Sequence, residues 1–165
     1  MKISVLYYSK TGNTKQMAEV IVEGVNSVDG VEAKAFALDA IDIDYFKKSA
    51  VVIIGTPIYQ SDMASAVRSW FEEKGASRLM VGKMGGAFAT ERYVYGGGES
   101  GIRNILAHML VCGMHVYSSG RAFGEPLIHL GPVALEYKLN ESKDIFKEYG
   151  RRMALKAVEL SLPEL

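Results

Sequence analysis

The feature of this sequence that most constrains its fold is a regular alternation of short apolar runs with segments of helical periodicity. The apolar runs have the character of strands and lie at residues 2–8, 31–38, 50–56, 84–90 and 114–118. The helical segments lie at residues 14–28, 44–49, 64–74, 99–112 and from about residue 140 or 142, where Asn140 or Ser142 could be the cap, to 160. Parallel strands need helical crossovers, which cover both faces of the sheet. The alternation therefore predicts one doubly wound α/β domain over residues 1–165, a three-layer sandwich.

The place of two strands in this sheet can be inferred from their side chains. Residues 50–56, AVVIIGT, are apolar without interruption, which is typical of a central parallel strand covered on both faces. The run at 31–38 carries Glu32 and Lys34, which favours an edge position.

Composition narrows the classes of partner. Nineteen basic and nineteen acidic residues give no net charge, so no long-range field attracts nucleic acid or an anionic membrane. The single cysteine, Cys112, cannot form an internal disulfide, and the N-terminus lacks the pattern of a secretory signal. We therefore expect a cytoplasmic protein that has neither nucleic acid nor membrane as a partner.

Polar segments follow three of the predicted strands. They lie at residues 9–14, 56–63 and 89–98. Because doubly wound sheets bind ligands at the carboxyl ends of their strands, we expect the three segments to converge on one site. Each alone could equally be a solvated connection, but their common placement favours a site.

The first of these segments has the chemistry of a phosphate site. Hydroxyls of Ser9, Thr11 and Thr14 and the Asn13 amide can donate hydrogen bonds, and Gly12 allows close approach of the backbone. The start of a helix adds free N–H groups and a favourable dipole. The spacing matches neither a P-loop nor a GxGxxG turn, and a terminal monophosphate requires neither. The alternative is a plain N-cap followed by a polar turn.

This segment resembles the phosphate loop of the flavodoxin superfamily, which follows the pattern Ser/Thr-x-Thr-Gly-x-Thr. The matching residues are Ser9, Lys10, Thr11, Gly12, Asn13 and Thr14. The resemblance implies a five-stranded parallel sheet of order 2-1-3-4-5 and a loop that holds the 5′-phosphate of FMN.

Two later stretches are similar to multimeric flavodoxin-like NAD(P)H:quinone oxidoreductases of the tryptophan-repressor-binding type. They are GTPIYQSDMASAVRSWFE, residues 55–72, and VGKMGGAFATERYVYGGGE, residues 81–99, although Tyr59 stands where that group has Arg. The similarity implies that one side of the flavin ring is lined by Thr56, Pro57, Ile58 and Tyr59. It implies that the pyrimidine edge is lined by Ala89, Thr90, Glu91, Arg92 and Tyr93, with Gly97 in the glycine run that follows.

Other side chains of chemical interest have simpler interpretations. Tyr59, Tyr93 and Tyr95 are candidates to stack on the flavin, and a half-buried surface position is the alternative for each. His108 and His115 have no partners at metal-ligand spacing, so we expect no metal site. Cys112 lies in an apolar helix without a nearby basic residue, and we expect it to behave as a small hydrophobic side chain.

The segment at residues 119–139 is long, rich in glycine and proline and without clear periodicity. Its apolar side chains argue against disorder. We expect the segment to pack over the flavin or against another subunit.

Two functions remain open from the sequence. The favoured one is an enzyme in which NAD(P)H reduces FMN and the reduced flavin passes electrons to a quinone or similar small-molecule acceptor. Such an enzyme needs no catalytic side chain, because the cofactor carries the chemistry. The resemblance of the sequence to the multimeric oxidoreductases also implies a homo-oligomer, a dimer or tetramer. The alternative is a flavodoxin-type carrier that serves redox partner proteins. Such carriers are typically strongly acidic, and the neutral charge of this chain favours the enzyme. A module that senses or stores FMN is a third possibility.

Overall fold

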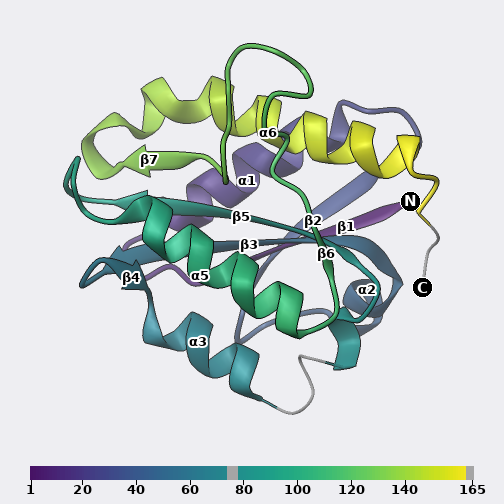
Figure 1. The fold of residues 1–165 in the computed structure, drawn as a ribbon, viewed down its shortest axis with the longest axis horizontal. Coiled ribbons are helices and arrows are strands. Elements are labelled where there is room, and N and C mark those ends of the chain that lie inside the picture. The colour runs from purple at the N-terminus through teal and green to yellow at the C-terminus, as the bar shows by residue number, and fades with distance from the viewer. Residues whose placement is uncertain (74–77, 163–165) are drawn as a thin grey trace.

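The computed structural model describes residues 1–73 and 78–162 as a sheet between two layers of helices. The strands are β1 (Lys2–Tyr7), β2 (Glu32–Ala37), β3 (Ser49–Tyr59), β4 (Asp62–Met63), β5 (Met84–Glu91), β6 (His115–Val116) and β7 (Val133–Leu135). The helices are α1 (Asn13–Asn26), α2 (Ile43–Lys48), α3 (Ser65–Glu72), α5 (Gly98–Val111) and α6 (Leu139–Glu159), which follows a short 3-10 turn at Glu136–Lys138. In Figure 1, α1 and α6 lie on one face of the sheet and α2, α3 and α5 on the other.

The predicted topology is confirmed. The parallel strands are ordered β2-β1-β3-β5-β6, which is the 2-1-3-4-5 order when the five predicted strands are numbered along the chain. β3 lies in the middle, and its apolar residues Ala50 to Ile54 are all buried. β2, with Glu32 and Lys34, pairs only with β1 among the described strands and is the predicted edge.

The fifth strand differs from its prediction. The sequence predicts a strand over residues 114–118, but β6 covers only His115–Val116, beside the start of β5 at Met84 and Gly85. β7 then pairs with the end of β5, where Ala89 faces Val133. Two short strands, β6 and β7, therefore share one edge position of the sheet, with residues 117–132 between them. β7 was not predicted, because an apolar run of three residues, VAL, is too short to indicate a strand.

The last helix also begins differently from its prediction. Neither Asn140 nor Ser142 caps it, because α6 begins at Leu139 and the Ser142 hydroxyl donates to the Lys138 carbonyl at 2.9 Å. The other predicted helices are confirmed to within a few residues, although Lys74, the predicted end of the third, lies outside the described residues.

The pair α1 and α6 packs unusually closely on the sheet. A Cβ atom at Gly24 would overlap the Lys147 carbonyl, and one at Gly150 would overlap the Ile21 carbonyl, so each helix supplies a glycine where the other crosses it. Only glycine permits such an approach of two backbones. This contact fixes α6 over α1 and thereby fixes the layer behind the site. None of the described helices is long and apolar enough to span a membrane.

Candidate functional site

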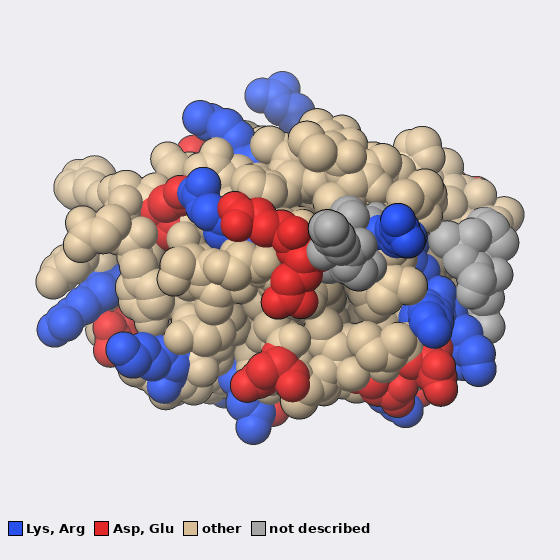
Figure 2. All heavy atoms as spheres, turned by 90° about the horizontal axis from the view of Figure 1, so that it is seen from below, with Lys and Arg blue, Asp and Glu red and all other residues tan. Residues whose placement is uncertain are grey.

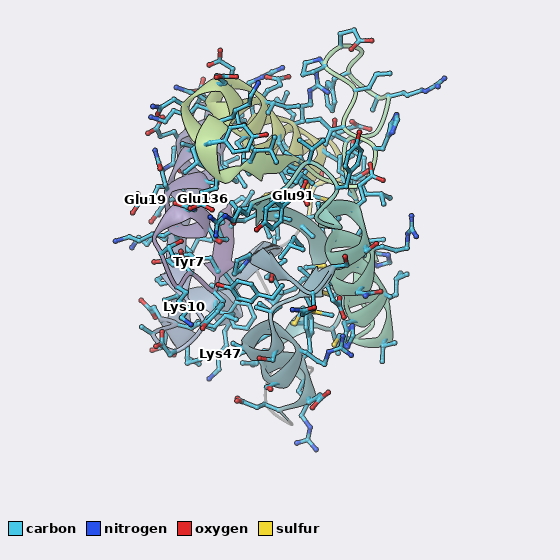
Figure 3. All side chains as sticks on the ribbon, turned by 90° about the vertical axis from the view of Figure 1, so that its left-hand side faces the viewer. Tyr7, Lys10, Glu19, Lys47, Glu91 and Glu136 are labelled. Atoms are coloured by element: carbon cyan, nitrogen blue, oxygen red, sulfur yellow. The ribbon has the colours of Figure 1, made fainter. Side chains whose placement is uncertain are left out.

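The three polar segments meet at the carboxyl edge of the sheet, on the left of Figure 1. They line a cleft of about 590 Å³. Its lining residues are Thr11, Asn13, Pro57, Ile58, Tyr59, Gln60, Ser61, Thr90, Glu91, Arg92, Tyr93, Tyr95, Gly96 and Glu136. Figure 3 looks onto this edge of the sheet, with Glu91 and Glu136 above Tyr7 and Lys10. The predicted convergence of the three segments is therefore seen in the structure.

The loop between β1 and α1 presents donors to the cleft. Gly12 takes a φ of 96°, in the left-handed region that favours glycine, and is the N-cap of α1. Its N–H donates to the Ser9 hydroxyl at 3.1 Å, which closes the turn. The first N–H groups of a helix have no intrahelical acceptor, so those of α1 are available to an anion. Thr11 and Asn13 line the cleft, while the Lys10 side chain is exposed beside it.

Thr14 has a different position from the other hydroxyl residues of this loop. It is 1% exposed, and its hydroxyl lies 2.8 Å from the hydroxyl of Thr90 on β5. Each hydroxyl has one donor and two acceptor positions, so the bond leaves capacity for a further partner. Thr14 therefore connects the first polar segment to the third.

The second segment is a tight hairpin of β3 and β4. Pro57, Ile58 and Tyr59 line the cleft, together with Gln60 and Ser61 of the turn. Thr56 is fully buried, and its hydroxyl accepts from Ala64 N–H at 2.9 Å, so it supports the hairpin from below. Both turn residues have positive φ angles, 53° and 61°.

The third segment combines a buried strand end with an exposed rim. Ala89 is fully buried and Thr90 is 4% exposed, whereas Arg92 and Tyr93 point into solvent at the cleft. Gly97 does not line the cleft. It packs against Ser61, where a Cβ atom would lie 2.7 Å from the Ser61 Cα, and so brings the third segment against the hairpin.

The aromatic candidates form an exposed rim. Tyr59, Tyr93 and Tyr95 all line the cleft, with exposed fractions of 45%, 67% and 96%. Burial, followed by the nearby Tyr8, raises the pKa of Tyr59 above its ordinary value. All three rings therefore lie at the mouth of the cleft.

The charged groups of the cleft come from β5 and from the turn after β7. The Glu91 carboxylate accepts from Gly98 N–H at 2.8 Å, at the start of α5. Burial raises the pKa of Glu91, and this hydrogen bond opposes the rise. Arg92 Nε lies 4.0 Å from Glu136 Oε2, and both side chains are more than half exposed.

Four lining residues were not predicted from the sequence: Gln60, Ser61, Gly96 and Glu136. Gln60 and Ser61 lie within a predicted polar segment, and their turn could have been recognised from its position between two short extended runs. Gly96 lies in the glycine run beside the predicted Gly97. Glu136 lies in the segment at residues 119–139 that could pack over the flavin, but nothing in the sequence singled it out, because β7, which brings it to the cleft, was not predicted.

Most of the long segment lies away from the cleft. Arg152 of α6, which is 1% exposed, donates to the Ser119 hydroxyl at 3.2 Å and to the carbonyls of Pro126 and Glu125 at 2.8 and 3.0 Å. In Figure 1 this part stands over α6, away from the cleft edge. No described residue of the segment before β7 lines the cleft, so this part does not pack over it, and only Glu136 at its end reaches the cleft. Packing against another subunit, the other half of the prediction, stays a prediction.

Other side chains of chemical interest lie outside the lining of the cleft. Trp70 is 9% exposed and lies edge-on to Phe46 and Phe71 in the core. Cys112 is buried, and burial raises the pKa of its thiol, as expected for a small hydrophobic side chain. His108 Nδ1 lies 2.8 Å from the Asn104 carbonyl. Within residues 1–73 and 78–162, no group of His, Cys, Asp or Glu could hold a metal ion.

The comparisons with known sequences point to one family. A model of the Flavodoxin family matches residues 5–119. The chain is 40% identical over 161 residues to a flavodoxin of Clostridium saccharobutylicum, which covers 97% of this chain and 99% of that one. It is 31% identical over 141 residues to an NAD(P)H dehydrogenase (quinone) of Syntrophobacter fumaroxidans, which covers 69% of each chain.

Solved structures share the fold at lower identity. The flavodoxin, WrbA-like protein from Agrobacterium tumefaciens has a TM-score of 0.79 at 19% identity and covers 96% of this chain and 98% of its own. The Fusobacterium nucleatum flavodoxin, solved bound to flavin mononucleotide, has a TM-score of 0.69 at 16% identity and covers 94% of this chain and 98% of its own.

Proposed function

The chain belongs to the flavodoxin family, and on that premise we propose that it is an electron carrier that holds FMN and passes electrons one at a time between redox partner proteins. The proposal replaces the enzyme that the sequence favours. It rests on the 40% identity to a flavodoxin along nearly the full length of both chains, and on the openness of the cleft.

The residues of the cleft fit FMN. Thr11, Asn13 and the N–H groups at the start of α1 would hold the phosphate, since they offer neutral donors and a positive helix dipole. Pro57, Ile58 and Tyr59 on one side and residues 91–93 on the other would hold the ring. When bound, FMN supplies a ring that accepts and releases electrons. The chain contributes position and electrostatics, and no acid or base among its side chains is required.

The single structural observation that carries the proposal is the position of the long segment. An enzyme that transfers hydride must hold a nicotinamide flat against the flavin at about 3 to 3.5 Å, which requires a walled pocket. In this chain the segment that could wall the pocket is bound to α6 through Arg152. An open mouth suffices for a carrier, which needs only an accessible edge of the ring.

The neutral charge is compatible with a carrier that is not steered over long distances. Figure 2 shows the face on the side of α3, where Lys and Arg side chains alternate with Asp and Glu side chains over uncharged surface. Such a surface has no extended field of one sign. We expect association with partner proteins to depend only weakly on salt, since steering by opposite charges is absent.

A second candidate is an NAD(P)H-dependent quinone reductase. The 31% identity to an NAD(P)H dehydrogenase (quinone) favours it, as does the similarity of residues 55–72 and 81–99 to that group. For this function a homo-oligomer would supply the wall that the single chain lacks.

Addition of NADH or NADPH to the FMN-loaded protein without oxygen separates the two candidates. We expect little bleaching of the yellow colour by either nucleotide, and no sustained turnover when a soluble benzoquinone is added. Rapid, complete bleaching followed by many turnovers with benzoquinone would establish the reductase and exclude the carrier. A protein that does not take up FMN would contradict both.

A further inference from the structure

One pair of side chains at the cleft is placed to respond to the charge of a bound ring. Among the described residues that line the cleft, Arg92 is the only Lys, Arg or His, and Glu136 and Glu91 are the carboxylates. Glu91 is engaged by Gly98 N–H at 2.8 Å. Arg92 and Glu136 are separated by 4.0 Å between Nε and Oε2, with exposed fractions of 73% and 51%.

The contact between Arg92 and Glu136 is a loose one. A separation of 4.0 Å is at the limit for an ion pair, and exposed pairs of this kind contribute at most about 1 kcal/mol. The guanidinium also lies over the ring of Tyr93, with Arg92 Cζ 5.7 Å from the ring centroid. Arg92 can therefore exchange Glu136 for a stronger negative partner in the cleft at little cost.

We propose that Arg92 is the counter-ion of the fully reduced cofactor and that Glu136 restrains it, so that this pair sets the potential of the second electron. The inference rests on the proposed function, since it requires FMN in the cleft. It concerns the electrostatics of this chain's own residues, and it gives β7 a role, because β7 carries the chain to Glu136.

The two electron steps differ in charge. When bound, FMN would supply one electron step that is coupled to a proton from solvent and leaves the charge of the cleft unchanged, and a second step that would add a negative charge at the ring. Charges near the flavin ring tune its electronic properties. A cation at the cleft therefore favours only the second step, and a carboxylate that holds the cation away opposes it.

The prediction is tested by the two reduction potentials of the FMN-loaded protein and three single variants. Arg92→Gln should lower the second potential by a change of roughly threefold to tenfold in the equilibrium constant, which is about 30 to 60 mV for one electron. Glu136→Gln should raise the same potential, because Arg92 is released. Arg121→Gln, which removes an equal charge from an exposed position on the long segment, should leave both potentials unchanged.

The pattern of shifts distinguishes this role from a structural one. A change in packing around the cofactor would move both potentials, whereas a counter-ion moves only the second and loses its effect at high salt. Unchanged second potentials in Arg92→Gln and Glu136→Gln, or shifts of equal sign in both, would overturn the inference. If the parent protein binds no FMN or takes up both electrons in one step, the proposed function fails first, and the two failures are thus distinguishable.

Discussion

The loop between β1 and α1 and the segment between β6 and β7 are both polar connections at a sheet, but their hydrogen-bonding groups face opposite ways. In the short loop, Thr11 and Gly12 are exposed, and the first N–H groups of α1 have no intrahelical acceptor. In the long segment, carbonyls turn inward onto the buried guanidinium of Arg152.

The difference teaches that length alone does not identify a functional loop. Buried polar groups need partners within the protein, while groups left free at a helix start are available to a ligand. The polar groups of the longer segment are bound within the protein by Arg152, and those of the shorter loop are available to a ligand. Three substitutions test this contrast, and a final titration tests the function inferred from it.

The largest expected effect is that of Arg152→Met on stability. The substitution leaves the carbonyls of Glu125 and Pro126 without their donor, so we expect the free energy of unfolding to fall by about 3 kcal/mol. Urea unfolding measures this directly. The neighbouring Arg151→Met is the control, because Arg151 pairs with Glu148 at the surface and the loss of this pair should cost less than about 1 kcal/mol.

FMN affinity provides the other half of this test. Folded Arg152→Met protein should bind FMN as tightly as the parent, since the guanidinium lies away from the cleft. A loss of affinity that parallels the loss of stability would show that the long segment belongs to the site, and the contrast between the two connections would be lost.

The fold could be predicted from the sequence because its signals are repeated along the chain. The apolar run at β3, the charges in β2 and the alternation of periods each indicate the same architecture. β7 could not be recognised, and β6 was predicted too long, because strands of three or two residues that pair with one end of β5 carry no periodicity of their own. Their place is determined by tertiary contacts, including those that hold residues 119–126 on α6.

The next effect is that of Thr11→Ala on cofactor binding. Loss of one hydroxyl donor to a charged phosphate should weaken FMN binding by about 1 to 3 kcal/mol, measured by fluorescence titration. Riboflavin, which lacks the phosphate, serves as the control ligand and should bind equally to both proteins. An equal loss of affinity for riboflavin would place Thr11 against the ring.

The smallest expected effect concerns the stability of the protein at acidic pH. Hydrogen bonds from Arg151, followed by those from Arg152, lower the pKa of Glu148 from 4.5 to about 2. A lowered pKa in the folded state stabilises the protein above pH 4.5, and this contribution disappears as the pH falls toward 2. With solvent screening at a side chain 24% exposed, we expect about 1 to 2 kcal/mol.

Urea unfolding of Glu148→Gln and of the parent at pH 7, 5 and 3 measures this contribution. The stability of the variant should decline less between pH 5 and 3 than that of the parent. Identical slopes in the two proteins would show that Glu148 does not support the Arg152 region through its charge.

The site was predictable in its location and less so in its details. Strand ends carrying polar residues identified all three walls, because parallel strands bring their carboxyl ends together. The hydroxyl pattern could not distinguish Thr11, which faces the cleft, from Thr14, whose hydroxyl is 2.8 Å from that of Thr90. Thr56 likewise supports the hairpin through Ala64 N–H. Which hydroxyls face a ligand depends on how the loop packs against β5. The sequence of the loop alone does not reveal this tertiary contact.

The most direct test of the account is a stepwise chemical reduction of the FMN-loaded protein without oxygen, followed by absorbance. The account predicts that the bound cofactor takes up its two electrons at two well-separated potentials, as a one-electron carrier requires, and that NADH and NADPH do not substitute for the chemical reductant. Uptake of both electrons in a single step, with rapid reduction by either nucleotide, would contradict it.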